Sequence, residues 1–140
     1  MDYVLPLGLS LIFLVLAGIH VYWAFWGLEG NLSAVPSIDG KPAFRPSPRA
    51  TLLVAAVLAL IALLVASVSD LIALPLPHAL LTWGTYAVAA SLLMRAIGDF
   101  RLVGFFKRVK GSRFAELDTR YFSPLCVALA AGLFAVAYAG

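Results

Sequence analysis

Residues 52–58 read Leu52-Leu53-Val54-Ala55-Ala56-Val57-Leu58, an apolar run without any alternation of polar and apolar side chains. A strand of a membrane barrel would alternate between the two, whereas a helix surrounded by lipid can be apolar on every face. A helix also satisfies its backbone hydrogen bonds within the segment, where lipid offers no partner. This run therefore predicts a membrane-spanning helix.

The same apolar character continues outward along most of the chain. About 20 residues suffice to cross roughly 30 Å of hydrocarbon, because a helix rises about 1.5 Å per residue. The uncharged stretches predict spans at about residues 3–28, 48–70, 77–98 and 120–139. We therefore expect an all-α fold, a four-transmembrane-helix bundle that forms a single membrane domain over residues 1–140.

The composition of the 140 residues agrees with this expectation, since 63% are hydrophobic and only 12% are charged. So few charged side chains cannot cover the surface of a soluble domain of this length. A soluble enzyme, a nucleic-acid-binding protein and a disordered tail are therefore excluded. The formal net charge of +3 is expected to act on lipid headgroups and on topology.

All ten basic residues flank two loops that the four spans place on the same side of the membrane. The first group is Lys41, Arg45 and Arg49, and the opposite side carries only Asp2 and Asp70. The second group comprises Arg95, Arg101, Lys107, Arg108, Lys110, Arg113 and Arg120. Because basic loops tend to stay in the cytoplasm, we expect both termini outside and a multi-pass protein of the cell (inner) membrane.

Two Ser-Pro pairs, Ser47-Pro48 and Ser123-Pro124, are typical of helix starts, with a serine N-cap before a proline at the first helical position. A fourth helix that began at Pro124 would reach only about 25 Å, however. The alternative is an earlier start at Asp118 or Thr119, with Pro124 inside a slightly kinked helix. The sequence leaves both starts open.

His20 lies inside the first predicted span, roughly 10 Å from its cytoplasmic end. An ionisable side chain at this depth is costly and usually faces a bundle interior, a cavity or a partner, so His20 is a candidate ligand-binding residue. Tyr22 and Trp23 join it as candidates at the level of the aromatic belt. The alternative is structural, a neutral imidazole bonded to a serine, a tyrosine or a backbone carbonyl of a neighbouring helix.

The third span closes with Arg95-Ala96-Ile97-Gly98-Asp99-Phe100-Arg101. Arg95 precedes Asp99 by four residues, so the two side chains can pair along a helix. Both are candidate ligand-binding residues, in a clamp for an anion or a lipid headgroup. Anchoring is the alternative, because an arginine near a helix C-terminus meets the negative end of the dipole and can snorkel to the headgroups.

The segment that leads into the fourth span adds Asp118 and Ser123 to the candidate ligand-binding residues. By helix rise, Cys126 lies near the layer of His20, with Arg95, Asp99 and Asp118 just beneath it. One cytoplasm-facing pocket can therefore collect these side chains. In the structural alternative, Asp118 caps a helix and the lone Cys126, which has no disulfide partner, packs as a small buried hydrophobe.

Between the third and fourth spans, Leu102, Phe105, Phe106 and Val109 recur at helical spacing among basic residues. A basic amphipathic segment of this kind gains about 1 kcal/mol for each Lys or Arg close to an anionic leaflet. We expect this cytoplasmic segment to lie on the membrane surface. Its predicted contacts with the lipid surface are Lys107, Arg108, Lys110 and Arg113.

Three motifs carry a family resemblance. They are His20-x-Tyr22-Trp23-Ala24, Arg95-Ala96-Ile97-Gly98-Asp99-Phe100 and Asp118-Thr119-x-Tyr121-x-Ser123-Pro124-Leu125-Cys126. Over nearly the whole chain the sequence resembles an uncharacterised bacterial family of small four-span integral membrane proteins, a domain of unknown function. The resemblance implies that the motif-bearing positions are His20, Trp23, Arg95, Asp99, Asp118 and Ser123. It implies no established activity, cofactor or partner.

Three classes of function remain open. We rank highest the binding of a small molecule or a lipid in a pocket at the cytoplasmic leaflet, with its chemical transformation left open. The second is a subunit of an oligomeric channel or transporter, because four short spans do not easily enclose a conduction path. The third is a structural or accessory membrane protein.

Metal and cofactor chemistry has little support in the sequence. His20 and His78 are expected toward opposite faces of the membrane, so they cannot both ligate one haem iron. With a single cysteine, the three or four ligands of a usual metal site are also missing. We expect no metal, no cofactor and no nucleic acid. The expected partners are membrane lipids, through anionic headgroups on the cytoplasmic side, and a homo-oligomer remains open.

Overall fold

The computed structural model describes residues 3–26, 37–38, 41–42, 47–98, 104–107 and 113–139. Its helices are α1 (Val4–Trp26), α2 (Pro48–Val68), α3 (His78–Ile97), α4 (Arg113–Leu117) and α5 (Ser123–Ala139). A π-helical turn, η2 (Asp118–Phe122), joins α4 to α5. Two short strands, β1 (Ser37–Ile38) and β2 (Lys41–Pro42), form an antiparallel pair.

Four helical segments in the described part of the chain are long and apolar enough to cross a membrane. They are Val4–Trp26, Pro48–Val68, His78–Ile97 and Ala115–Ala139, with mean hydropathies of 2.4, 2.9, 1.3 and 1.9. The last segment runs without interruption from α4 through η2 into α5. The predicted all-α fold with four helices of membrane-spanning length is confirmed, and these helices indicate a multi-pass membrane protein.

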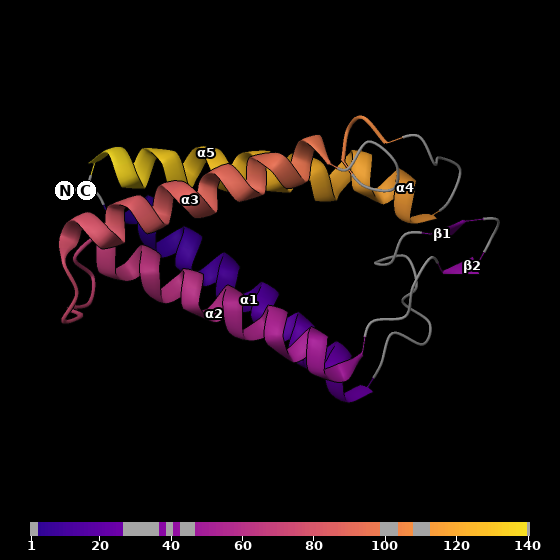
Figure 1. Ribbon diagram of the computed structural model, residues 1–140, viewed down its shortest axis with the longest axis horizontal. Coiled ribbons are helices and arrows are strands. Elements are labelled where there is room, and N and C mark those ends of the chain that lie inside the picture. The colour runs from indigo at the N-terminus through magenta and orange to yellow at the C-terminus, as the bar shows by residue number, and fades with distance from the viewer. Residues whose placement is uncertain are drawn as a thin grey trace.

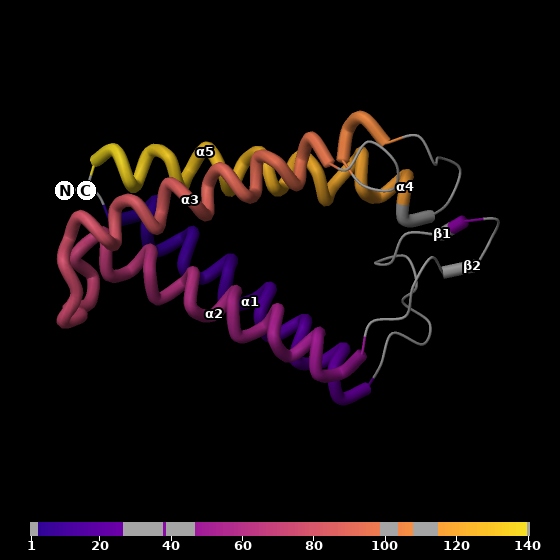
Figure 2. Tube along the Cα trace, in the orientation of Figure 1, coloured from indigo at the N-terminus to yellow at the C-terminus, as the bar shows by residue number. Residues whose placement is uncertain are grey.

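The long helices form two antiparallel pairs, α1 with α2 and α3 with α5 (Figure 1). The pairs meet where both termini and the turn between α2 and α3 lie, which we call the terminal end. They diverge toward the opposite end, where α1 and α3 end and where α2 and α4 begin (Figure 2). We call this opposite end the loop-side end.

The apolar core that joins the two pairs lies toward the terminal end. Phe13 of α1, Val65 of α2 and Leu133 of α5 are completely buried there, and α3 contributes Leu81 and Ala89. All of them except Ala89, which lies just past the middle of α3, come from the half of their helix that is nearer to the terminal end. The two pairs are therefore packed together by apolar contacts at one end of the molecule.

Small side chains allow the helices to approach closely in this core. Ser10 Oγ donates a hydrogen bond to the Ala62 carbonyl oxygen at 3.2 Å, which joins α1 to α2. Gly132 of α5 lies against Leu9 of α1, and a Cβ atom at Gly132 would be 3.0 Å from Leu9 Cδ2. Small residues at such crossings replace the hydrophobic driving force that lipid does not supply.

The two Ser-Pro pairs have different roles in the structure. Ser47 caps α2 as expected, because its Oγ accepts a hydrogen bond from the Ala50 N–H at 3.1 Å and Pro48 occupies the first turn. Ser123 is helical, with φ −69° and ψ −44°, so it is not an N-cap. The helix begins earlier, at Arg113, and Pro124 lies inside it.

The π-helical turn η2 immediately precedes the Ser123-Pro124 pair. Inside a regular α-helix, Pro124 would lack the bond to the carbonyl four residues back, and its ring would press on that carbonyl. The widened turn avoids this conflict, and the Ser123 N–H donates to the Asp118 carbonyl oxygen five residues back. The proline therefore accounts for the irregular backbone at the start of the fourth span.

Candidate functional site

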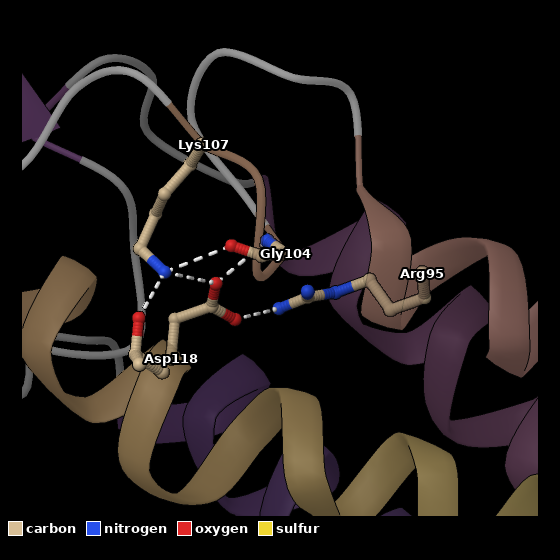
Figure 3. Close-up of polar contacts among 5 residues, drawn as sticks. Arg95, Gly104, Lys107 and Asp118 are labelled. Carbon is tan, nitrogen blue, oxygen red and sulfur yellow. Dashed lines mark hydrogen bonds and ion pairs between the residues drawn. The ribbon is translucent and has the colours of Figure 1, made fainter.

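The carboxylate of Asp118 is the centre of a buried polar cluster at the loop-side end (Figure 3). Its Oδ1 accepts a hydrogen bond at 2.8 Å from Nη2 of Arg95, which lies in the last turn of α3. Its Oδ2 accepts from the Gly104 N–H at 2.6 Å and forms an ion pair with Lys107 Nζ at 3.1 Å. Both carboxylate oxygens are thus satisfied within the protein.

Lys107 is part of this cluster, which corrects the expectation that it contacts the lipid surface. Its side chain is 1% exposed. Besides Asp118, its ammonium donates to the Gly104 carbonyl oxygen at 2.9 Å and to Thr119 Oγ1. The long lysine side chain reaches these three acceptors because the chain reverses direction next to it. The helical spacing of the neighbouring apolar residues does not predict this reversal.

Two glycines with left-handed backbone create this reversal. Gly98 has φ 89° at the C-terminus of α3, and Gly104 has φ 88°. The Phe105 N–H then donates to the Ala96 carbonyl oxygen at 2.8 Å, which fixes residues 104–107 on the end of α3. A Cβ atom at Gly104 would collide with the backbone of Ile97 and Gly98, so this position requires glycine.

Positive charge exceeds negative charge among the described members of the cluster, because Arg95 and Lys107 share the single carboxylate of Asp118. The Arg95 side chain remains 33% exposed. Its Nη1 is buried and has no hydrogen-bond partner among the described residues. A guanidinium uses its donors best in a fork that engages two oxygens, so Arg95 has unused binding capacity.

Ser123 and Cys126 follow Asp118 along the same helix. Ser123 is completely buried, and its Oγ has no hydrogen-bond partner in the described part of the chain. Cys126 is a half-buried free thiol that lies within electrostatic range of both Arg95 and Asp118. The structure thus brings Arg95 together with Asp118, as expected, and places Cys126 near them.

His20 is bonded within its own helix. Its Nδ1 lies 2.7 Å from the Leu16 carbonyl oxygen, and its ring packs edge-on against Trp23 with centroids 5.0 Å apart. The structural alternative placed this bond on a neighbouring helix, whereas the structure has it within α1. Because a carbonyl oxygen only accepts, Nδ1 carries the hydrogen, and in the neutral imidazole Nε2 is left as an acceptor. Tyr22 is exposed and stacks on Trp26.

Some candidate residues lie outside the described part of the chain. Asp99, Arg108 and Lys110 are among them, as is the side chain of Arg113, so the expected pair of Arg95 with Asp99 is not described. Gly104 and Thr119 were not candidates for the site, although each bonds to Asp118 or to Lys107. A glycine three residues before a predicted amphipathic lysine gives no recognisable signal by itself.

A separate groove lies between α1 and α2 and has a volume of about 630 Å³. It contains none of the predicted site residues. Its wall is almost entirely apolar: Ser10, Leu14, Ala56, Ala59, Leu60, Ala62, Leu63 and Ala66. Within the described ranges, no three His, Cys, Asp or Glu side chains gather closely enough to hold a metal ion.

Comparison with known proteins gives the family of the chain. No curated protein and no solved structure matches it. The family described as Protein of unknown function (DUF3995) matches residues 13–133, a range that includes His20, Arg95, Lys107 and Asp118. The match confirms the resemblance to a domain of unknown function and covers most of the chain, so this protein belongs to the DUF3995 family.

Proposed function

We propose that this membrane protein binds an anionic small molecule or lipid headgroup at the loop-side end of α3 and α5, with Arg95 as the principal contact. The observation that carries the proposal is the guanidinium of Arg95. One nitrogen is held by Asp118, while another is buried without an acceptor among the described residues and the side chain stays one-third exposed. A buried donor without a partner costs about 1–3 kcal/mol, which an anionic ligand would remove.

Charge supports the same ligand class. Two buried or half-buried cations face one carboxylate in the described cluster, so the site favours a further negative charge. A phosphate or carboxylate suits an arginine fork, because two parallel N–H groups can meet two oxygens. Lys107 and Asp118 act as positioning residues in this proposal, since their polar atoms are already bonded within the protein.

The loop-side end would face the cytoplasm in this proposal. All ten basic residues of the chain flank the two segments at that end, which is the usual distribution for cytoplasmic loops of inner-membrane proteins. Phe105 and Phe106 are 42% and 62% exposed there and could enter the headgroup region. Arg108, Lys110 and Arg113 remain proposed contacts with anionic headgroups.

Candidate contacts from the other helix pair are His20, Tyr22 and Trp23. His20 offers an unprotonated Nε2 when neutral, which can accept a hydrogen bond from a ligand hydroxyl. Asp99 and Ser123 also remain candidates on the α3 and α5 side. Whether the ligand is only bound or also chemically changed is open in this proposal.

Native mass spectrometry of the protein released from nanodiscs of mixed phosphatidylglycerol and phosphatidylcholine tests the proposal. The wild-type protein should retain phosphatidylglycerol or a co-purified anionic molecule, and Arg95→Ala should lower the retained fraction at least tenfold. The matched control is Arg49→Ala, which removes an exposed arginine at the same end of the molecule and should lower retention much less than Arg95→Ala does. Equal retention in all three proteins would contradict the proposal.

A second variant, Asp99→Asn, tests whether a carboxylate of the chain itself is the acceptor for Arg95. Asp99 follows Arg95 by four residues and lies outside the described part of the chain. If an anionic ligand is the acceptor for Arg95, Asp99→Asn should not raise the retention of phosphatidylglycerol. A marked gain in retention would show that the chain's own carboxylate occupies the guanidinium in the wild-type protein, and the proposal would fail.

A structural role is the second candidate function, and the saturation of Asp118 favours it. Both carboxylate oxygens are used to hold α3, α5 and residues 104–107 together. In that case the cluster would serve only to close the loop-side end. A ligand-free protein whose folding, but not binding, depends on Asp118 would support this role instead.

A further inference from the structure

Burial decreases along one face of α1 toward the loop-side end. Leu9 and Phe13 are 5% and 0% exposed, whereas His20 on the same face is only half-buried. His20 follows Leu9 by eleven residues, about three turns of 3.6 residues, so the two side chains leave α1 in nearly the same direction. Because Leu9 contacts Gly132 of α5, His20 is directed toward the α3 and α5 pair.

The opposite wall on α5 shows the same change. Ala128 and Leu125 precede Gly132 by four and seven residues, about one and two turns, so they share its face. Both are exposed, with Leu125 at 38%. The two helix faces that contact each other at Leu9 and Gly132 are therefore uncovered nearer the loop-side end, where the two pairs diverge (Figure 2).

The uncovered faces combine an apolar wall with polar groups at one end. Leu125 to Gly132 supplies about 10 Å of largely apolar helix surface along the axis of α5. Arg95 lies at the loop-side end of α3, where its Nη1 has no partner in the part of the chain that the structure describes, and His20 lies on the opposite wall. A site with a charged group at one end and apolar side chains along its length complements an amphiphile.

Charge distinguishes a lipid from a second copy of this chain as the occupant. In the sequence, all ten basic residues lie within or next to the two segments that connect the helices at the loop-side end, so a second copy placed there would bring like charges toward Arg95. An anionic lipid brings the opposite charge and is attracted by about 1 kcal/mol for each basic residue near the surface. Its hydrocarbon can also cover the apolar faces without leaving an unsatisfied polar group.

We infer that an anionic phospholipid inserts an acyl chain between the α1 and α2 pair and the α3 and α5 pair at the loop-side end, with its phosphate at Arg95. This inference rests on the proposed function and names its ligand. The acyl chain lies between the face of His20 and the face of Leu125 and Ala128. The lipid enters laterally from the leaflet that adjoins the loop-side end.

The first test fills the proposed space without touching the charged groups. Ala128→Phe should lower the retained phosphatidylglycerol at least tenfold in native mass spectra from nanodiscs. Ala56→Phe is the matched control, because Ala56 is an exposed alanine that lines the separate groove between α1 and α2. It should retain lipid as the wild type does. Loss of lipid only in Ala56→Phe would overturn the inference.

The second test needs no variant, so it is independent of folding. A phosphatidylglycerol with a photoactivatable diazirine in the middle of one acyl chain is incorporated in nanodiscs with the wild-type protein. Labelling should fall on peptides that contain Leu125 and Ala128 and on the loop-side half of α1. Labels confined to the groove around Leu60, or a protein dimer whose formation excludes the label from these peptides, would overturn the inference.

Free glycerol 3-phosphate separates failure of the inference from failure of the proposed function. If both hold, Arg95→Ala loses phosphatidylglycerol and the free phosphate binds far more weakly than the lipid. If glycerol 3-phosphate binds as tightly as the lipid and Ala128→Phe changes nothing, the acyl-chain site is wrong while the anion site stands. If Arg95→Ala retains all lipid, the proposed function fails, and with it the placement of the phosphate.

Discussion

The two ends of the molecule are held together by different forces. At the terminal end, apolar side chains from all four long helices form one core, with Phe13, Val65 and Leu133 completely buried. At the loop-side end, the pair of α3 and α5 is joined by the buried carboxylate of Asp118, and the pair of α1 and α2 diverges from it (Figure 1).

This contrast indicates where binding can occur in a small bundle. Apolar packing in lipid is nonspecific in chemistry and leaves no polar group free to recognise a ligand. Burying the polar cluster costs desolvation free energy, which its hydrogen bonds and ion pairs must offset. The cluster also holds Arg95 where the packing between the two pairs ends. Recognition is therefore expected at the loop-side end, and folding stability is expected to depend on both ends in different ways.

Asp118→Asn should have the largest effect on stability. It removes the charge that Arg95 and Lys107 share and turns one acceptor into a donor that faces them. Breaking a buried ion pair from one side typically costs about 3–5 kcal/mol, because the remaining charge stays buried. Reversible unfolding in mixed micelles, followed by circular dichroism, should show a loss of free energy in this range.

Glu116→Gln is the control for Asp118→Asn. Glu116 lies two residues earlier in the same segment, but its side chain is 57% exposed and its contact with Arg120 is 4.0 Å long. Exposed pairs contribute at most about 1 kcal/mol. If Glu116→Gln and Asp118→Asn destabilise the protein equally, the cluster does not hold the loop-side end as described.

Gly104→Ala should have the second largest effect. Its φ of 88° is unfavourable for any residue with a Cβ atom, and the added methyl group would collide with the backbone at Ile97 and Gly98. We expect a loss of about 2–3 kcal/mol in the same unfolding assay. Gly18→Ala is the control, since a Cβ atom there meets nothing within 4 Å in a helix. A neutral Gly104→Ala would contradict the described fold of residues 104–107.

The four helices could be predicted because each depends on a property of the local sequence. A run such as Leu52 to Leu58 needs no knowledge of its neighbours, since lipid surrounds it and every face can be apolar. The cap at Ser47 is equally local, because its oxygen bonds three residues ahead. Such signals act within one helical turn, so they can be read directly from the chain.

The cluster at Asp118 could be predicted only in part because its contacts are not local. The depth of Arg95 and of Asp118 along their spans correctly indicated that the two residues lie close together, since helix rise fixes depth. Lys107 was wrongly placed on the lipid surface. Its burial depends on a chain reversal at Gly98 and Gly104, and helical periodicity assumes that no reversal occurs.

The start of the fourth span shows a conflict between two local signals. Ser123-Pro124 has the pattern of a helix start, but the length needed to cross the membrane favours an earlier one. In the structure the longer helix forms, and the π-helical turn at residues 118–122 accommodates the proline. Each local pattern is consistent with its own helix start, so neither alone decides between the two.

Gly132→Leu should cost less than either change in the cluster, and it probes the terminal end. The new side chain would enter the contact with Leu9, where even a Cβ atom would be 3.0 Å from Leu9 Cδ2. Overpacking of this kind typically costs about 1–3 kcal/mol. Ala128→Leu adds bulk one turn away on the same face, where the surface is exposed, and should change stability by less than about 0.5 kcal/mol. Equal effects would show that the two pairs stay packed along their whole length.

Ser47→Ala should have the smallest effect, because it weakens the loop-side end only within one helix. The hydroxyl satisfies the Ala50 N–H at the start of α2, and loss of an N-cap costs about 1 kcal/mol. The Ser47 carbonyl still accepts from Thr51, so the first turn keeps its other bonds. Ser91→Ala is the control, since its exposed hydroxyl bonds only to Ala87 in its own helix. A cost as large as that of Asp118→Asn would mean that the start of α2 is tightly packed at the loop-side end. The α1 and α2 pair could then not diverge from α3 and α5, and no space would remain for a lipid chain.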